Sequence, residues 1–428
     1  MKRESACGIG FLVCSLALLL AFCLINTANA TNGYFANGYS VESKAMGGAG
    51  VALPLGSLDA AINPANMAFV GTRIDIGLSL FNPNREYTVK GNPSGFPGTF
   101  GLAPGTEKSN SRWFLIPSIG ANKKLDDNNS IGISIYGNGG MNTDYDTRTF
   151  GGSDPTGVDL MQLFIVPTYA RKIAPKHAVA ISAIFAYQRF EARGLEAFGA
   201  LGFSNSPDNL TNNGHDNSYG FGGKIGYAGE ILPFLSVGAS YQTRIWMSKL
   251  DEYKGLFAEQ GDFDIPATWT IGVAIKPIPD LVLLADVQEI YYSDVRSINN
   301  PIIPNILHRK FGEDKGAGFG WDDITILKLG VQWQSSKEWT WRAGYSIGDQ
   351  PIPAREVLAN ILSPGVVKQH VTGGVTKTIG NNQELKFAVM HALSNDVTGA
   401  NPLEAPGQQK IRIKMNQWEF SVGYAWKF

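Results

Sequence analysis

Apolar and polar positions alternate with a period of two along most of the chain after residue 72. In RIDIGLSL, residues 73–80, the isoleucines and leucines share one face, and WEFSVGYAWKF at the end of the chain repeats the pattern with aromatic residues. Successive side chains of a β-strand point to opposite faces, so the pattern predicts strands that are apolar on one side only. We expect about fourteen strands, which begin near residues 72, 111, 129, 158, 176, 216, 234, 264, 280, 321, 338, 366, 383 and 409.

The connections between these strands alternate in length. Short turns such as IAPK and GNNQ separate long connections such as residues 193–216 and 248–264. An antiparallel membrane barrel with short turns at one rim and long loops at the other produces this pattern. A soluble β-sandwich also alternates, but it has no reason to segregate its long connections to one end. The sequence therefore predicts an all-β fold, a transmembrane antiparallel barrel of about fourteen strands.

The charged residues indicate which face of the wall is the lumen. Lys224, Arg244, Lys328 and Lys386 fall on the small or polar parity of their strands. A basic residue that faced lipid at mid-membrane would cost about 2–4 kcal/mol, so this parity is assigned to the lumen. Two segments depart from the rule. Arg189 falls on the lipid parity, and is expected above the hydrocarbon, while KIRIKM and WEFSV differ in phase, which predicts a bulge between them.

The first thirty residues have the features of a secretory signal peptide. Lys2 and Arg3 precede a long apolar run that ends in Ala28-Asn29-Ala30, so residues 1–30 are predicted to be removed, with a membrane anchor as the alternative. All three cysteines lie in this leader, which leaves none for a disulfide after cleavage. The net charge of −1 argues against a nucleic-acid partner. Export and a barrel together predict the bacterial outer membrane.

Residues 31–71 do not alternate and are rich in glycine and alanine. A segment with this many apolar residues must be covered, and the interior of the barrel formed by residues 72–428 is available. We therefore predict an N-terminal hatch that plugs the lumen, with a disordered tail as the alternative.

The predicted hatch contains AMGGAGVALPLGSLDAAINPANMAF, which resembles the hatch of the FadL-type outer-membrane transporters of long-chain fatty acids and aromatic hydrocarbons. The matching positions include Asn63, Pro64 and Ala65, and Asp349 begins the loop signature DQPIP. The resemblance covers essentially the whole chain after the leader. It implies passive uptake of fatty acids or of aromatic or aliphatic hydrocarbons, with capture at outer loops and release sideways through a kinked third strand. Outer-membrane lipid and, through Phe428, the barrel-assembly machinery are the expected partners.

The third predicted strand, IGISIYGNGGMNTDY, is interrupted by Gly137, Asn138, Gly139 and Gly140. Glycine weakens a strand because it has no side chain to pack and loses the most backbone entropy on ordering. In view of the resemblance, we interpret GNGG as the lateral exit, with an ordinary bulge as the alternative. Substitution of Gly139 or Gly140 by Trp is then expected to block uptake and leave folding intact.

Apolar residues in two long loops predict an outer ligand-binding surface, with mutual packing over the barrel as the alternative: Leu195, Phe198, Leu201, Phe203, Leu256 and Phe257. The resemblance implies that Tyr34 and Phe35 reach a pocket in the lumen. Arg244 and Lys328 are candidate partners for a ligand carboxylate, although solvation or an ion pair with Asp286 would also explain them. Asp322 and Asp323 stand where the family has a lysine, so uncharged hydrocarbons remain open as substrates.

Catalytic and metal-binding motifs are not found in the sequence. The histidines at 177, 215 and 391 have no partners at the spacing of a metal site or a catalytic triad. We therefore expect no enzymatic activity, no metal and no cofactor. A solute porin and an adhesion or structural barrel are the competing functions, and a porin would need an open, water-filled lumen.

Overall fold

The computed structural model describes residues 32–428, so the predicted signal peptide lies outside the described residues. Within this range no helix is both long and apolar enough to cross a membrane.

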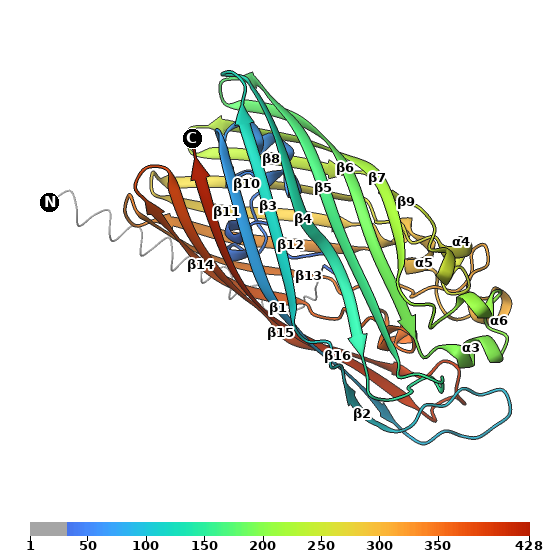
Figure 1. Cartoon of the computed structure of the whole chain (residues 1–428). Coiled ribbons are helices and arrows are strands. Elements are labelled where there is room, and N and C mark those ends of the chain that lie inside the picture. The colour runs from blue at the N-terminus through green and yellow to red at the C-terminus, as the bar shows by residue number, and fades with distance from the viewer. Residues whose placement is uncertain (1–31) are drawn as a thin grey trace.

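Fourteen antiparallel strands close into a barrel (Figure 1). The strands are β1 (Arg73–Lys90), β2 (Gly105–Lys108), β3 (Phe114–Lys124), β4 (Asn129–Asp144), β5 (Gly157–Ala174), β6 (His177–Arg193), β7 (Asp216–Leu232), β8 (Leu235–Gln242), β9 (Trp246–Met247), β10 (Thr268–Ile278), β11 (Leu281–Ile290), β12 (Ile324–Gln334), β13 (Trp339–Gly348), β14 (Gln369–Ile379), β15 (Gln383–Ala400) and β16 (Lys410–Lys427). Pairing of β1 with both β3 and β16 closes the ring, whereas β2 pairs with β1 and β9 with β7 outside it.

The period-two pattern correctly predicted where most of the ring strands begin. The largest difference is at β10, which was expected near residue 264 and begins at Thr268. The strand predicted to begin near residue 234 and to contain Arg244 is wrong in its second half, because β8 ends at Gln242 and the chain leaves the sheet before the short β9. Strands as short as β2 and β9 carry too few residues for a periodic signal.

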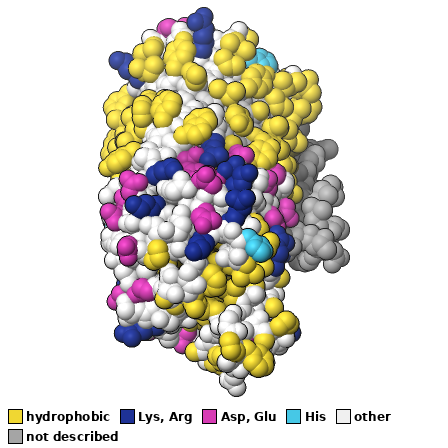
Figure 2. Space-filling view, turned by 90° about the vertical axis from the view of Figure 1, so that its right-hand side faces the viewer, with side chains coloured by type: hydrophobic (Ala, Val, Ile, Leu, Met, Phe, Trp, Pro, Cys, Tyr) yellow, Lys and Arg dark blue, Asp and Glu magenta, His cyan; other side chains and the backbone are white. Residues whose placement is uncertain are grey.

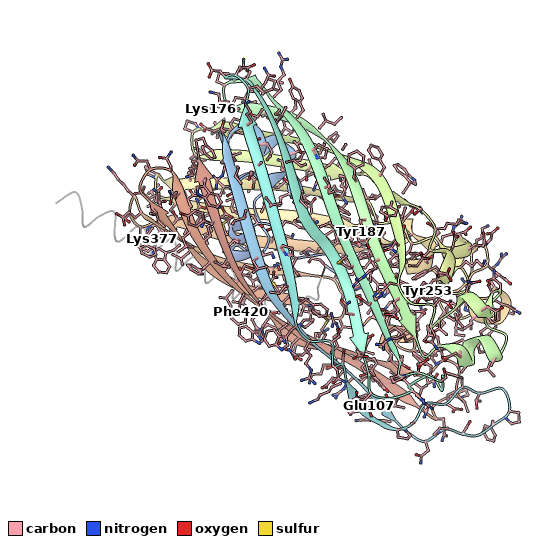
Figure 3. All side chains as sticks on the ribbon, viewed as in Figure 1. Glu107, Lys176, Tyr187, Tyr253, Lys377 and Phe420 are labelled. Carbon is pink, nitrogen blue, oxygen red and sulfur yellow. The ribbon has the colours of Figure 1, made fainter. Side chains whose placement is uncertain are left out.

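The two rims of the barrel differ as expected. Figure 3 marks Lys176 and Lys377 toward the short-turn rim and Glu107 and Tyr253 toward the long-loop rim. The long connections hold short helices: α3 (Glu196–Ala200), η3 (Pro207–Asn209), η4 (Asp251–Tyr253), α4 (Ala258–Gly261), η5 (Tyr292–Asp294), α5 (Arg296–Asn299), α6 (Asn305–His308), η6 (Ala354–Glu356) and η7 (Ala359–Ile361). Phe428 is exposed at the short-turn rim, where its N–H donates to Thr72 O (3.0 Å), and its role in assembly stays a prediction.

The polarity of the wall inverts along each long strand. On β16, Trp418, Phe420 and Val422 are exposed on the outer face, while Ile411 and Ile413 are buried on the inner face. β16 pairs with β1 without interruption and its parity never slips. A bulge does lie at the level between KIRIKM and WEFSV, but its extra residue is on the neighbouring β15, where the register shifts between Ala392 and Asn395 opposite Gln417 and Met415. We call the part with exposed apolar side chains, residues 418–427 on β16, the membrane half, and the part toward the long loops, residues 410–417, the outer half.

The outer face of the outer half is polar. Figure 2 shows hydrophobic side chains gathered in the upper part of the molecule, with a zone of mixed charged side chains below them. Arg189 belongs to this outer half, where it pairs with Asp159 (3.0 Å). Its position agrees with the expectation that it lies beyond the apolar belt.

The segment before β1 occupies the interior of the ring. It contains α2 (Val41–Ala45), η1 (Asp59–Ala61) and η2 (Pro64–Ala68), and nearly all of its residues are buried. Its backbone bonds to side chains from separate parts of the wall: Gly47 N–H donates to Thr372 Oγ1 (2.8 Å) on β14, and Ser57 O accepts from Ser134 Oγ (2.7 Å) on β4. We refer to residues 32–72 as the hatch segment.

Ion pairs hold the hatch segment to the membrane half. Lys386 on β15 pairs with Glu42 of α2 and with Asp75 of β1 (2.6 Å), and Arg73 pairs with Asp75 (2.7 Å). Glu42, Asp75 and Glu384 lie close enough together to ligate a metal ion, but Lys386 and Arg73 already neutralise them. The interior of the membrane half therefore holds charge-compensated ion pairs, beside an apolar part in which the hatch segment packs against the wall.

Candidate functional site

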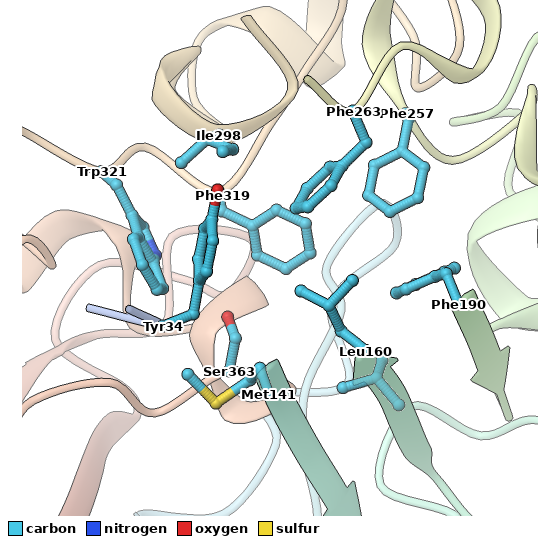
Figure 4. A pocket seen from close by; sticks show the side chains of 11 residues that line it. Tyr34, Met141, Leu160, Phe190, Phe257, Phe263, Ile298, Phe319, Trp321 and Ser363 are labelled. Atoms are coloured by element: carbon cyan, nitrogen blue, oxygen red, sulfur yellow. The ribbon is translucent and has the colours of Figure 1, made fainter. Parts of the chain in front are cut away.

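A small apolar cavity lies in the outer half, directly above the start of the hatch segment (Figure 4). Three parts of the chain form it. The hatch segment provides Tyr34, the wall provides Met141, Val158, Leu160 and Phe190, and the long loops provide Phe257, Phe263, Ile298, Phe319, Trp321 and Ser363. Its volume is about 40 Å³. A cavity that holds benzene measures roughly 150 Å³, so a ring of that size enters only if lining side chains move.

Aromatic side chains dominate this cavity. Six of the residues that line it are aromatic, and the Tyr34 ring lies 5.9 Å from Trp321 and 6.3 Å from Phe263 between ring centroids. Neither lysine nor arginine occurs among the described residues of the lining. Such a lining suits an uncharged apolar ligand.

The loop residues predicted to form an exposed capture surface are mostly packed. Leu195, Phe198, Leu256 and Phe257 are buried, and Phe203 packs against the same core. Leu201 alone remains on the surface, with 53% of its area exposed. The structure thus contradicts an exposed patch built from all six residues and matches the alternative of mutual packing. Only Phe257 among them lines the cavity.

The two basic residues predicted for the lumen pocket do not line the apolar cavity. Arg244 lies beyond the end of β8 and pairs with Asp264 (2.6 Å) and Asp262 (3.3 Å), so loop carboxylates already neutralise its charge. Its strand parity was misread because the strand ends before it. Lys328 does face inward, where its Nζ donates to Asn37 O (3.1 Å).

Lys328 and Lys224 line a second, polar cavity of about 20 Å³ beside the hatch segment. Lys224 Nζ donates to Ala61 O. The ion pair considered between Lys328 and Asp286 is not formed. Asp286 Oδ2 accepts from the backbone N–H groups of Gly50 (2.7 Å) and Val51 (2.9 Å), and Asp286 Oδ1 has no hydrogen-bond partner among the described residues. These contacts fix the hatch segment to the wall.

The third strand of the ring, β4, is broken where the glycines predicted it. β3 and β4 pair only over residues 118–124 and 130–136. Both strands continue toward the outer rim, β3 to Phe114 and β4 to Asp144, without pairing to each other. The β4–β5 ladder shifts register between Gly137 and Gly139, so Asn138 is bulged. We call this unpaired stretch, residues 137–143 of β4 facing residues 114–117 of β3, the β3–β4 break.

The hatch segment takes the place of β3 along this break. Ala36 N–H donates to Asn138 O (3.0 Å), Gly140 N–H donates to Tyr34 O (3.0 Å), and Phe35 forms a β-bridge with Gly139. At the outer end Asn110 N–H donates to Asp144 O (2.7 Å). Unpaired backbone is not tolerated in lipid unless protein satisfies it, and here the hatch segment does so.

The side chain of Asn138 points into the barrel. Its amide donates to Gln162 Oε1 (3.0 Å) and its Oδ1 accepts from the Tyr39 hydroxyl (3.2 Å). Gln162 in turn donates to Gln188 Oε1 (2.7 Å). The bulge therefore carries a polar network on the lumen side of an otherwise apolar site.

The glycines of the break differ in what a side chain would meet. A Cβ on Gly139 would lie 2.0 Å from Tyr34 O, and one on Gly140 would lie 2.5 Å from Leu160 O. The expectation that Trp at these two positions leaves folding intact is therefore wrong, because both would displace backbone. Gly137 has only Ile116 Cγ2 at 3.1 Å and one further atom at 3.8 Å, so it tolerates a side chain best.

The Asn63-Pro64-Ala65 motif has a structural role. Asn63 Oδ1 caps η2 by accepting from Ala65 N–H (3.1 Å), and its amide donates to Val51 O (2.7 Å) and Tyr227 O (2.8 Å). Proline suits the first turn because its missing N–H would have no helical partner there. The motif thus fixes the fold of the hatch segment and its contact with β7.

A family model for the outer membrane protein transport protein family (OMPP1/FadL/TodX) matches residues 22–428. No curated protein matches the sequence. Among solved structures, the toluene transporter TodX of Pseudomonas putida has 18% identity and a TM-score of 0.69, over 92% of this chain and 99% of that one. A FadL homologue of Pseudomonas aeruginosa has 15% identity and a TM-score of 0.68, over 92% and 100%.

The Ralstonia pickettii toluene transporter TbuX has 17% identity and a TM-score of 0.62, over 92% of this chain and 99% of that one. At these identities the likeness to solved structures establishes the fold, and the family match establishes the membership. Members of this family are transport proteins rather than enzymes. The chain therefore belongs to the OMPP1/FadL/TodX family of outer membrane transport proteins.

Proposed function

We propose that the protein takes up uncharged hydrophobic molecules by diffusion and releases them sideways into the membrane through the β3–β4 break. One observation carries this proposal: Tyr34 belongs to both sites. Its ring lines the apolar cavity, and its carbonyl accepts from Gly140 N–H in the break. A ligand that displaces the ring therefore loosens the backbone contacts that close the wall.

The route follows from the order of the parts. The long loops form the roof of the cavity, and Tyr34, whose ring stacks on Phe35, forms its floor. Below them the hatch segment is held by ion pairs and buried hydrogen bonds, so the direct way to the short-turn rim is filled. The break beside the cavity is the remaining way out, and Gly137 and Gly139 keep it free of side chains.

The chemistry of the cavity favours a hydrocarbon over a fatty-acid anion. Moving a carboxylate into an apolar site without a cationic partner is costly, and the described lining contains no cation. Arg244, one of the two predicted partners for a carboxylate, is paired with two aspartates. Two of the similar structures are toluene transporters by name, which supports the same class of ligand.

Gly137→Trp tests lateral release. The indole would occupy the break, and the nearest atom it must displace is a methyl group of Ile116 rather than backbone. We expect uptake of radiolabelled toluene by cells that produce the variant to fall to the level of cells without the protein. Gly137→Ala is the matched control and retains uptake. Normal uptake by correctly folded Gly137→Trp would refute release through the break.

A solute porin makes a different prediction. An open lumen would carry a steady ion current through the intact protein in a planar bilayer, whereas a lumen filled by the hatch segment carries none. A large, persistent conductance of the wild-type protein would therefore contradict the proposed route.

A further inference from the structure

The hydroxyl group of Tyr34 has no hydrogen-bond partner among the described residues. Only 5% of the Tyr34 surface is exposed, and the residue lines the apolar cavity (Figure 4). Buried hydroxyls are nearly always paired, because leaving one unpaired forfeits its hydration without compensation. An unpaired hydroxyl inside a ligand cavity therefore needs a reason.

Neighbouring polar groups are all engaged with other partners. The Tyr292 hydroxyl donates to Asn32 O, and Trp321 Nε1 donates to Asn360 Oδ1 (2.6 Å). Gln162 uses its Oε1 for Asn138 and one amide hydrogen for Gln188, and its second amide hydrogen can only donate toward Tyr34 Oη, which leaves the Tyr34 O–H hydrogen without an acceptor. Tyr34 differs from the surrounding polar aromatic residues in keeping its donor free.

The lining offers little to hold a water molecule beside this hydroxyl. A buried water typically makes about three hydrogen bonds. Besides Tyr34, two lining side chains carry a polar atom, Ser363 and Trp321. Both already donate to Asn360 Oδ1, the Ser363 hydroxyl at 3.0 Å and the Trp321 indole N–H at 2.6 Å, so neither has a hydrogen left to donate to a water molecule. The free hydroxyl is better matched to a ligand that brings an apolar body and a single acceptor.

We propose that Tyr34 selects neutral aromatic ligands that carry one oxygen acceptor, such as a ketone or a phenol, over the corresponding hydrocarbons. This inference rests on the proposed function, since it concerns the ligand of the same cavity. The ring of such a ligand packs against Phe263, Phe319 and Trp321, and its oxygen accepts from Tyr34 Oη. A carboxylate is excluded from this class because no cation is at hand to compensate its charge.

Tyr34→Phe removes the hydroxyl and nothing else. Because that hydroxyl bonds to no described residue, the variant keeps the hydrogen bonds of the hatch segment and is expected to fold. We compare binding of acetophenone and ethylbenzene, which are similar in size and differ in one carbonyl oxygen, to the purified full-length protein by calorimetry. We expect the variant to bind acetophenone about fivefold more weakly, which corresponds to one neutral hydrogen bond, and ethylbenzene with unchanged affinity.

The control is Tyr39→Phe. The Tyr39 hydroxyl donates to Asn138 and does not line the apolar cavity, so its removal should leave the ratio of the two affinities as in the wild type. An equal change for both ligands in Tyr34→Phe would overturn the selective role and leave a packing role. Failure of the wild type to bind either ligand would instead contradict the proposed function of the cavity.

Discussion

The membrane half and the outer half of the barrel are built from the same strands with opposite polarity. In the membrane half the outer face is apolar and the interior holds ion pairs around Lys386, whereas in the outer half the outer face is charged and the interior is an aromatic cavity. Each half buries what the other exposes, because one is surrounded by lipid and the other by water.

This difference explains why a hydrophobic ligand would change direction. In the outer half the interior is the most apolar environment, so a ligand gains by entering it. At the level of the hatch segment the interior is filled by the packed hatch segment and its ion pairs, and the accessible apolar environment lies outside the wall. The β3–β4 break lies beside this boundary, since Gly140 bonds to Tyr34 at the floor of the cavity. The change of environment between the two halves thus favours a sideways exit of the ligand.

Breaking the interior of the membrane half should have the largest effect. Lys386→Met leaves Glu42 buried without its cationic partner and removes one of two cations from Asp75. Removing one member of a buried ion pair costs about 3 kcal/mol or more, so we expect a clearly lower thermal midpoint in detergent and faster proteolysis of the hatch segment. Adding Glu42→Gln should recover part of the loss. A midpoint equal to that of the wild type would show that these ion pairs do not hold the hatch segment.

Exchanging residues on the outer face tests the boundary itself. Phe420 and Lys414 lie on the same face of β16, Phe420 in the membrane half with 47% of its area exposed and Lys414 in the outer half beside Glu86 (3.3 Å). Phe420→Lys places a charge against lipid and should cost about 2–4 kcal/mol, seen as reduced assembly of heat-resistant barrel. Lys414→Phe loses only a partly exposed ion pair at the surface, worth about 1 kcal/mol or less. Equal effects of the two changes would place both residues in the same environment.

The smallest expected effect concerns the loops of the outer half. Burial and the neighbouring Asp264 raise the pKa of Asp262 from its ordinary value of 3.8 to about 6. The folded protein therefore favours the protonated carboxyl of Asp262. The stability that this preference contributes is fully present below pH 4 and is lost as the pH rises through 6. Asp262→Asn should raise the thermal midpoint at pH 7.5 by about a degree and flatten its change between pH 4 and 7. Asp208→Asn, in an exposed part of the same loops, is the control, and an identical pH profile in both variants would exclude this role of Asp262.

The sequence was sufficient for the ring strands because their side chains face two different environments at every step. It misled where the environments exchange: the alternation in KIRIKM continues in phase on β16, but its isoleucines face the lumen, and the bulge at this level lies on β15 instead. Amino-acid order records polarity and period, and it does not record how far the strand extends beyond the membrane.

The site could be predicted only in part. The glycines of β4 and the aromatic start of the hatch segment indicated the break and its neighbour, Tyr34. Phe190, Phe263 and Trp321 were missed because they come from a strand and two separate loops, and no spacing links them before the loops pack. Arg244 was misassigned since nothing in TRIWM indicates that the strand ends at Gln242.

The β-bridge between Phe35 and Gly139 also bears on aggregation. Wherever β4 lacks β3, it is an edge strand, and exposed edges are templates for pairing with other chains. Because the first residues of the hatch segment occupy this edge, the protein shields its own aggregation-prone rim with its own backbone. A barrel whose hatch segment has not yet docked would present that edge to its neighbours in the crowded plane of the membrane.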